Sequence, residues 1–160
     1  MFSYISAEEA VQQVQSGNRI FFQGAAMTPK VIINALCKRY KELQNVDIVQ
    51  MHTEGEALYA EAPYDKSFNV NSCFVGGNVR RNVNSVHGDY IPIFLSEMHL
   101  LFKRGILPLD VAFIQVSPPD KHGYCSLGTS IDVTLTAIHY AKKVIAQVNP
   151  QVPRTHGDGI

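Results

Sequence analysis

The feature that most constrains the fold is a run from Val111 to Val116 that is apolar at every position except Gln115. A strand with one face in water alternates polar and apolar residues, whereas a strand covered on both faces has no need of polar positions. A second, largely apolar run, Val144 to Val148, follows a predicted helix over residues 131–141. This order of strand, helix and strand predicts an α/β domain whose mainly parallel sheet is flanked by helices.

The same alternation runs through the rest of the chain. A capping box from Ser6 to Glu9 opens the first helix, which ends at Gly17, and Thr28 as N-cap with Pro29 as first residue opens the second. The further strands are predicted at residues 19–22, 46–51 and 68–75. The second helix is predicted to end near Tyr40. Two further helices are predicted over residues 54–62 and 96–103, and the latter ends before Gly105.

Composition excludes several classes of function. The 14 basic residues balance 14 acidic ones, so no charge excess marks a nucleic-acid partner or an anionic membrane surface. The chain has no run of 18 apolar residues for a membrane span, and its first residues lack a secretory signal. Three widely separated cysteines, Cys37, Cys73 and Cys125, fit reduced thiols. We therefore expect a cytoplasmic protein of one domain, without nucleic-acid or membrane partners.

Three small or glycine-containing loops follow predicted strands. In parallel sheets the ligand crevice lies beyond the carboxyl ends of the strands, so these loops are the candidate site. The first precedes a helix N-terminus, where free amides and the helix dipole favour an anion or oxyanion. The loops are Gly24 to Ala26, Gly76 to Asn78 and Ser117 to Gly128.

Simpler interpretations exist for each feature. Glycines after strands are common turn residues. His122 and Cys125 have no second pair at zinc spacing, so no metal site is predicted. Arg80 and Arg81 fit a solvated pair or a phosphate clamp. Nucleotide-binding glycine motifs and the Gly-x-Ser-x-Gly elbow are absent. The apolar segment Tyr90 to Leu95 fits either the core or an exposed face that a second domain covers.

Six segments of the sequence resemble the acetyl-CoA hydrolase/transferase family, which includes 4-hydroxybutyrate, butyrate and acetate CoA-transferases. The resemblance covers essentially the whole chain in order. The matching segments are Gln50–Glu56, Phe74–Arg80, Asp89–Glu97, Leu107–Ala112, Val116–Gly128 and Asn149–Asp158.

The resemblance implies a CoA-transferase-like domain, residues 1–160, which faces a second α/β domain of the same protein. It implies a coenzyme A thioester and a small carboxylic acid as substrates, with no permanently bound cofactor. It also implies that this domain forms one wall of the substrate pocket. The residues expected there are Gln23, Gly24, Ala25 and Ala26 as backbone walls of an oxyanion loop, with Gly76, Gly77, Asn78, His122, Gly123 and Tyr124 lining the same cleft. The nucleophile is expected to be a glutamate of the C-terminal domain, outside this chain. None of Glu54, Glu56, Glu61 or Glu97 matches its motif, so this chain is expected to hold no catalytic residue and to be inactive alone.

Three alternatives stay open at this point. The chain could act as a stand-alone ligand-binding or interaction module of the same fold. The enzyme could be an acetyl-CoA hydrolase that does not exclude water from its acyl-enzyme. A homo-oligomer is also possible, and neither the acyl group nor the acceptor follows from the residues.

Overall fold

A computed structural model describes residues 3–155, which form one six-stranded sheet with the strand order β4-β3-β2-β1-β5-β6. Every neighbouring pair of strands is parallel, which confirms the predicted fold class. The strands are β1 (Arg19–Phe22), β2 (Val46–Gln50), β3 (Phe68–Ser72), β4 (Gly88–Tyr90), β5 (Leu109–Val116) and β6 (Ala141–Val148). The end of the last family segment, residues 156–158, lies outside the described residues.

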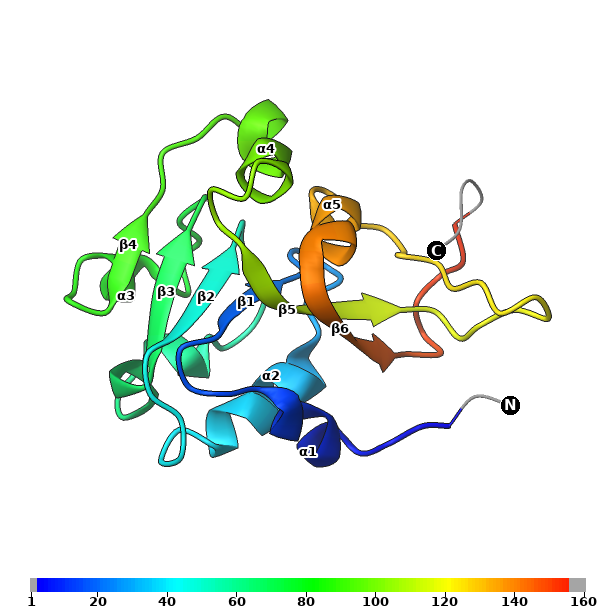
Figure 1. The fold of residues 1–160 in the computed structure, drawn as a ribbon, viewed down its shortest axis with the longest axis horizontal. Coiled ribbons are helices and arrows are strands. Elements are labelled where there is room, and N and C mark those ends of the chain that lie inside the picture. Colours follow the sequence, from blue (N-terminus) through cyan, green and yellow to red (C-terminus); the bar gives the residue numbers. More distant parts are fainter. Residues whose placement is uncertain (1–2, 156–160) are drawn as a thin grey trace.

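Helices cover both faces of the sheet (Figure 1). The α-helices are α1 (Ala7–Ala10), α2 (Lys30–Lys38), α3 (Arg80–Val83), α4 (Met98–Lys103) and α5 (Thr134–Tyr140). Single 3-10 turns are η1 (Val11–Gln13), η2 (Leu58–Ala60), η3 (Tyr64–Lys66) and η4 (Leu95–Glu97). No helix within residues 3–155 is long and apolar enough to cross a membrane.

The core consists of two apolar layers on opposite faces of the sheet. Alternation along β1 divides its residues between them: Ile20 and Phe22 join the larger layer with α1 and α2, and Phe21 joins the layer under α4 and α5. Phe22 stacks on Phe113 of β5 and meets the ring edge of Tyr59. Successive residues of each strand point to opposite layers, so a shift by one residue would move every side chain to the wrong face. Burial on both faces therefore fixes the register of the sheet.

Several predicted boundaries differ from the structure. The Ser6 cap is present, with the Glu9 amide donating to Ser6 Oγ over 3.1 Å, but α1 has one turn before it tightens into η1. Helix α2 starts at Lys30 with Pro29 as its N-cap. Thr28 is not the cap, because its hydroxyl donates to the Ala25 carbonyl over 2.7 Å.

The helix predicted over residues 54–62 is wrong except for the turn η2. The preceding segment is held to other loops: the Glu54 amide donates to Thr28 Oγ1, and the Gly55 carbonyl accepts from the side chain of Asn78. These tertiary contacts override the local helical pattern. Strand β3 likewise stops at Ser72 instead of reaching residue 75.

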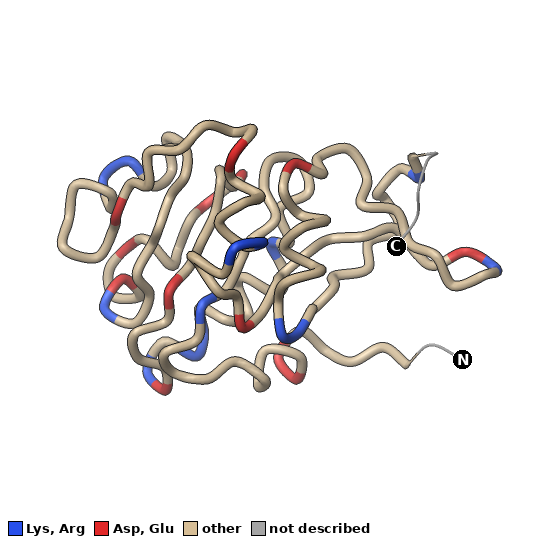
Figure 2. The backbone as a smooth tube through the Cα atoms, turned by 45° about the horizontal axis from the view of Figure 1, so that its top comes forward, with Lys and Arg blue, Asp and Glu red and all other residues tan. Residues whose placement is uncertain are grey.

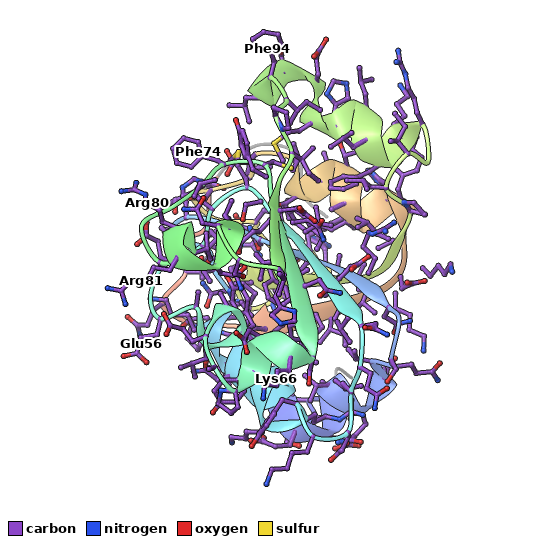
Figure 3. The ribbon with its side chains drawn as sticks, turned by 90° about the vertical axis from the view of Figure 1, so that its left-hand side faces the viewer. Glu56, Lys66, Phe74, Arg80, Arg81 and Phe94 are labelled. Atoms are coloured by element: carbon purple, nitrogen blue, oxygen red, sulfur yellow. The ribbon has the colours of Figure 1, made fainter. Side chains whose placement is uncertain are left out.

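The segment Tyr90 to Leu95 is divided between core and surface. Ile91 and Ile93 pack against the layer under α4 and α5, whereas Tyr90, Phe94 and Leu95 are exposed. Figure 3 shows Phe94 pointing away from the sheet. Charged residues of both signs are interspersed around the backbone in Figure 2.

Candidate functional site

The loops after β1, β2 and β3 meet at the carboxyl edge of the sheet. They comprise residues 23–27, 52–56 and 74–78, and we call them the β1–β3 loops. The Ala25 amide donates to the His52 carbonyl over 3.0 Å, and Ala25 forms an isolated parallel bridge with Thr53. His52 in turn meets the ring of Phe74 edge to face, with centroids 5.8 Å apart. The loops that follow β1, β2 and β3 are therefore linked, each to its neighbour, by these contacts.

The β1 and β2 loops approach so closely that position 24 has room only for glycine. A Cβ atom on Gly24 would lie 2.4 Å from the carbonyl oxygen of His52. The next residue, Ala25, has a φ of +49°, a left-handed conformation that costs a residue with a side chain about 1–2 kcal/mol. Such strained residues are concentrated at functional sites.

The backbone amides around this loop are unequally used. Those of Val31 and Ile32, in the first turn of α2, donate to the side-chain oxygen of Gln147 over 3.0 and 3.4 Å. The helix N-terminus is therefore capped by β6, contrary to the expectation that its amides lie free. Within residues 3–155, the amides of the buried Gly24 and the exposed Ala26 donate no hydrogen bond.

A buried chain of hydrogen bonds lies beneath the same loops. The Tyr59 hydroxyl donates to Gln50 Oε1 over 2.6 Å and lies 2.7 Å from Thr53 Oγ1. Gln50 donates onward to the hydroxyl of Ser72 at the end of β3. Burial raises the pKa of Tyr59 above its usual value, so its hydroxyl stays protonated and keeps donating at neutral pH.

Asn78 closes this network from the β3 side. Its side-chain amide donates to the carbonyls of Thr53 and Gly55 over 3.0 and 3.1 Å. The β3 loop is thereby attached to the β2 loop at two points. The network fixes the relative positions of these two loops without using a charged group.

A hollow of about 310 Å³ opens between the β2 and β3 loops, lined by residues 52–55, Phe74 and residues 76–78. A second hollow of about 240 Å³ lies on the α2 side of Thr53, Glu54 and Gly55. Phe74 is exposed at the mouth of the first, where Figure 3 shows its ring at the surface. An apolar ring therefore lies beside polar backbone groups at this hollow.

The predicted residues fall into two groups. Gly24, Ala25, Gly76, Gly77 and Asn78 belong to the connected β1–β3 loops, and Ala26 is exposed beside them. His122, Gly123 and Tyr124 lie on the loop after β5, which projects from the body of the molecule in Figure 1.

The loop after β5, Ser117 to Ser126, which we call the β5 loop, is held by hydrogen bonds within itself and with the segment after β6. Asp120 Oδ1 accepts from the amides of His122 and Tyr124 over 2.8 and 3.0 Å. Arg154 donates to the Tyr124 carbonyl over 2.6 Å. These contacts give the tip of the loop no link to residues 76–78.

Gln23 has a different place from its neighbours. Its side chain is fully buried and joins the end of β1 to β5 and to the segment after the β5 loop: Oε1 accepts from the Gln115 amide over 2.7 Å, and Nε2 donates to the Ser130 carbonyl over 3.0 Å. This bridge crosses the point where the strand order reverses between β1 and β5. The Gln23 side chain therefore connects neighbouring strands and does not line the hollow between the β2 and β3 loops.

Sequence reasoning missed His52, Thr53, Tyr59 and Phe74, which complete the connected part of the site. Placing residues 52–56 in a loop directly after a buried strand would have pointed to the first two. Arg80 and Arg81 on α3 are exposed and point outward in Figure 3.

The thiols of this chain are poor nucleophiles. All three cysteines are free, and burial raises the pKa of Cys37 to about 12 and that of Cys73 to about 11. Burial also raises the pKa of Cys125. Since the thiolate is the reactive form, these raised pKa values disfavour covalent attack by any of the three cysteines.

Residues 3–160 match the family model for the acetyl-CoA hydrolase/transferase N-terminal domain. The chain is 43% identical over 155 residues to a succinyl-CoA:acetate/propanoyl-CoA:succinate CoA transferase of Fasciola hepatica, covering 96% of this chain and 32% of that protein. It is 44% identical over 154 residues to a 4-hydroxybutyrate coenzyme A transferase of Clostridium kluyveri, covering 96% and 36%.

Solved structures agree with this assignment. The 4-hydroxybutyrate CoA-transferase of Porphyromonas gingivalis has a TM-score of 0.78 at 32% identity, covering 97% of this chain and 35% of that one. RipA from Yersinia pestis, at 23% identity and a TM-score of 0.87 over 96% of this chain and 38% of its own, shares the fold. The chain spans about a third of the length of the curated relatives it matches. It belongs to the acetyl-CoA hydrolase/transferase family, whose N-terminal domain it matches.

Proposed function

We propose that this chain is the N-terminal domain of an acyl-CoA:carboxylate CoA-transferase. The observation that carries the proposal is the match, over 96% of the chain at 43% and 44% identity, to two proteins named as CoA-transferases. Their names include small carboxylates such as acetate, succinate and 4-hydroxybutyrate. The substrates would therefore be a coenzyme A thioester and a small carboxylic acid, without a permanently bound cofactor.

The reaction would run through a glutamate of the C-terminal domain. The carboxylate attacks the acyl-CoA carbonyl and expels CoA thiolate, which leaves a mixed anhydride. The thiolate then attacks the glutamyl carbonyl of the anhydride, releasing the first carboxylic acid as its anion and forming a glutamyl-CoA thioester. The incoming carboxylate reverses both steps, so the energy of the thioester is kept in a covalent bond throughout.

Each attack creates a tetrahedral oxyanion, and the β1 loop of this chain has the groups to stabilise it. The Gly24 and Ala26 amides have no hydrogen-bond partner within the described residues, and the bond from the Ala25 amide to the His52 carbonyl attaches this loop to its neighbour. Preorganised donors of this kind act without reorganisation when charge develops. The neighbouring hollow between residues 52–55 and 76–78 would take the acyl or acceptor group.

The partner of this domain would be the polypeptide that follows it in the same protein. Glu54 and Glu56 are exposed on the β2 loop, and neither matches the family's nucleophile motif. We therefore assign the covalent step to a glutamate outside residues 1–160. The cytoplasm, where acyl-CoA thioesters are available, is the expected location.

The test uses the whole protein that contains this domain. It is incubated with an acyl-CoA and acetate, and the new acyl-CoA is followed by chromatography. Mass spectrometry is then used to find the CoA adduct, which should lie on a glutamate outside residues 1–160. A modified Glu54 or Glu97 would contradict the assignment. Free CoA without a new thioester would identify a hydrolase, and binding without turnover would identify a non-catalytic module.

A further inference from the structure

The two edges of the sheet are protected very differently. At one edge, β4 has three residues, of which Asp89 and Tyr90 are exposed. Short strands and charges are the usual protection against unwanted pairing. At the other edge, β6 has eight residues, and after Lys142 and Lys143 it continues with apolar residues. Within residues 3–155, β6 pairs only with β5, so its outer edge presents free backbone groups.

A groove of about 790 Å³ runs along this open strand. One wall is the apolar end of β6, where Val144 is 41% exposed. The other wall is formed by the N-terminal segment and the first turn of α2, where Tyr4, Ile5 and Val31 are each more than half exposed. Figure 1 shows the N-terminal segment beside this end of β6. Exposed apolar side chains gathered on both walls indicate a surface that another segment covers.

The direction of the β6 amides defines where a partner would bind. The Asn149 amide, directly after β6, donates to the Val116 carbonyl of β5. Alternate residues of a strand direct their backbone groups to opposite edges, and the register from Lys143 to Val148 is unbroken. The amides of Ile145 and Gln147 therefore face β5, and those of Val144 and Ala146 face outward.

We propose that an extended segment of the polypeptide following this domain pairs with the outer edge of β6 and places apolar side chains in the groove. This inference rests on the proposed function. The curated relatives match over only about a third of their length, so they carry enough further chain to supply a strand. The described chain also stays beside the groove after β6, since Pro150 lines it.

The test is amide hydrogen exchange of the whole protein, resolved to single residues by fragmentation mass spectrometry. The amides of Val144 and Ala146 should exchange as slowly as those of Ile145 and Gln147, because both sets would be hydrogen-bonded. Exchange of Val144 and Ala146 as fast as that of the exposed Lys121 would overturn the proposal. Protection that disappears when dilution separates two copies would also overturn it, since the occupant would then be a second molecule.

A pair of variants provides an independent measurement. Ile5→Asp should lower the melting temperature of the whole protein by several degrees, because Ile5 lines the groove and the substitution puts a charge where the added segment would cover it. Val86→Asp, at a position that is 91% exposed, should leave it unchanged. Equal melting temperatures for the two variants would contradict the inference.

CoA transfer is measured on the same sample, which separates this inference from the proposed function. Activity without protection of Val144 and Ala146 refutes only the edge pairing. Protection without activity refutes the proposed function and retains the paired edge.

Discussion

The β1–β3 loops and the β5 loop leave the same edge of one sheet but are held in opposite ways. The β1–β3 loops are fixed by one another, through the Ala25–His52 contact and the bonds of Asn78 to residues 53 and 55. The β5 loop is fixed by the bonds of Asp120 to two amides of its own turn and by Arg154 after β6, which donates to the Tyr124 carbonyl. Both contain glycine, so glycine content alone does not distinguish them.

The difference follows from the strand order. β1, β2 and β3 are consecutive neighbours, and adjacent strands lie about 4.8 Å apart, so their loops are within hydrogen-bonding distance of each other. β5 is also adjacent to β1, but its chain turns into a hairpin-like loop that projects away in Figure 1. A wall shared by three strands is positioned by folding of the sheet. The β5 loop is bonded to its own turn and to the segment after β6, so it can move without disturbing that wall.

The largest expected effect comes from breaking the contact between the β1 and β2 loops. Gly24→Val places a Cβ 2.4 Å from the His52 carbonyl oxygen, so the two loops must separate and the Gly24 and Ala26 amides must move. Loss of an oxyanion donor typically lowers kcat by about 100- to 1,000-fold. We expect a loss of this size in the whole enzyme, together with a lower free energy of unfolding, measured by steady-state kinetics and urea titration.

The control is Gly77→Ala in the β3 loop. A Cβ on Gly77 meets no atom within 4 Å, so its free energy of unfolding should change by less than about 0.5 kcal/mol. If Gly24→Val retains normal kcat and stability, the close approach between the β1 and β2 loops is only a turn, and the contact between these loops is not needed for catalysis.

A smaller effect is expected from the hydroxyl beneath the β2 loop. Tyr59→Phe removes the donor to Gln50 Oε1 and the partner of Thr53 Oγ1. A buried polar atom left without its partner costs about 1–3 kcal/mol. We expect a loss of unfolding free energy of this size in urea titration. The NMR signals of the His52 side chain should also shift, because the β1–β3 loops are connected.

Tyr64→Phe is the matched control, since Tyr64 is half-buried and its hydroxyl forms no hydrogen bond within residues 3–155. Its free energy of unfolding should change by less than about 0.5 kcal/mol. Equal losses in the two variants would mean that the ring, and not the hydroxyl, carries the effect of Tyr59.

The pattern of apolar residues was sufficient to predict most of the sheet. Strand β1 has the predicted bounds, and β5 and β6 are each extended by a few residues, because continuous apolar runs leave little alternative to a buried strand. Strand β4 was missed, since Gly88, Asp89 and Tyr90 show no apolar run. It exists because the end of β3 offers it a pairing edge.

The candidate site was predictable as far as its loops, but not as far as the side chains that connect them. Gly24 was singled out for its place after a strand, whereas the physical constraint on it is a carbonyl 28 residues away, at His52. The contacts of Asn78 with residues 53 and 55 also join distant segments. Hydrophobic periodicity carries no information about such partners, since it records which face is buried and not which polar atoms meet.

The smallest expected effect concerns Asp120, which tests whether the β5 loop is independent. Partial burial raises the pKa of Asp120, but the amides of His122 and Tyr124 and the nearby Arg154 outweigh this, so the pKa is lowered. A lowered pKa means that the carboxylate stabilises the loop above the ordinary value of about 3.9, and that this contribution is lost as the pH falls through the lowered value. In an NMR titration, the amide signals of His122 and Tyr124 should therefore move together, with a midpoint below the ordinary range.

Asp120→Ala should speed the hydrogen exchange of the His122 and Tyr124 amides at neutral pH while the His52 signals stay in place. Movement of His52 with the β5 loop would show that the two regions are coupled after all.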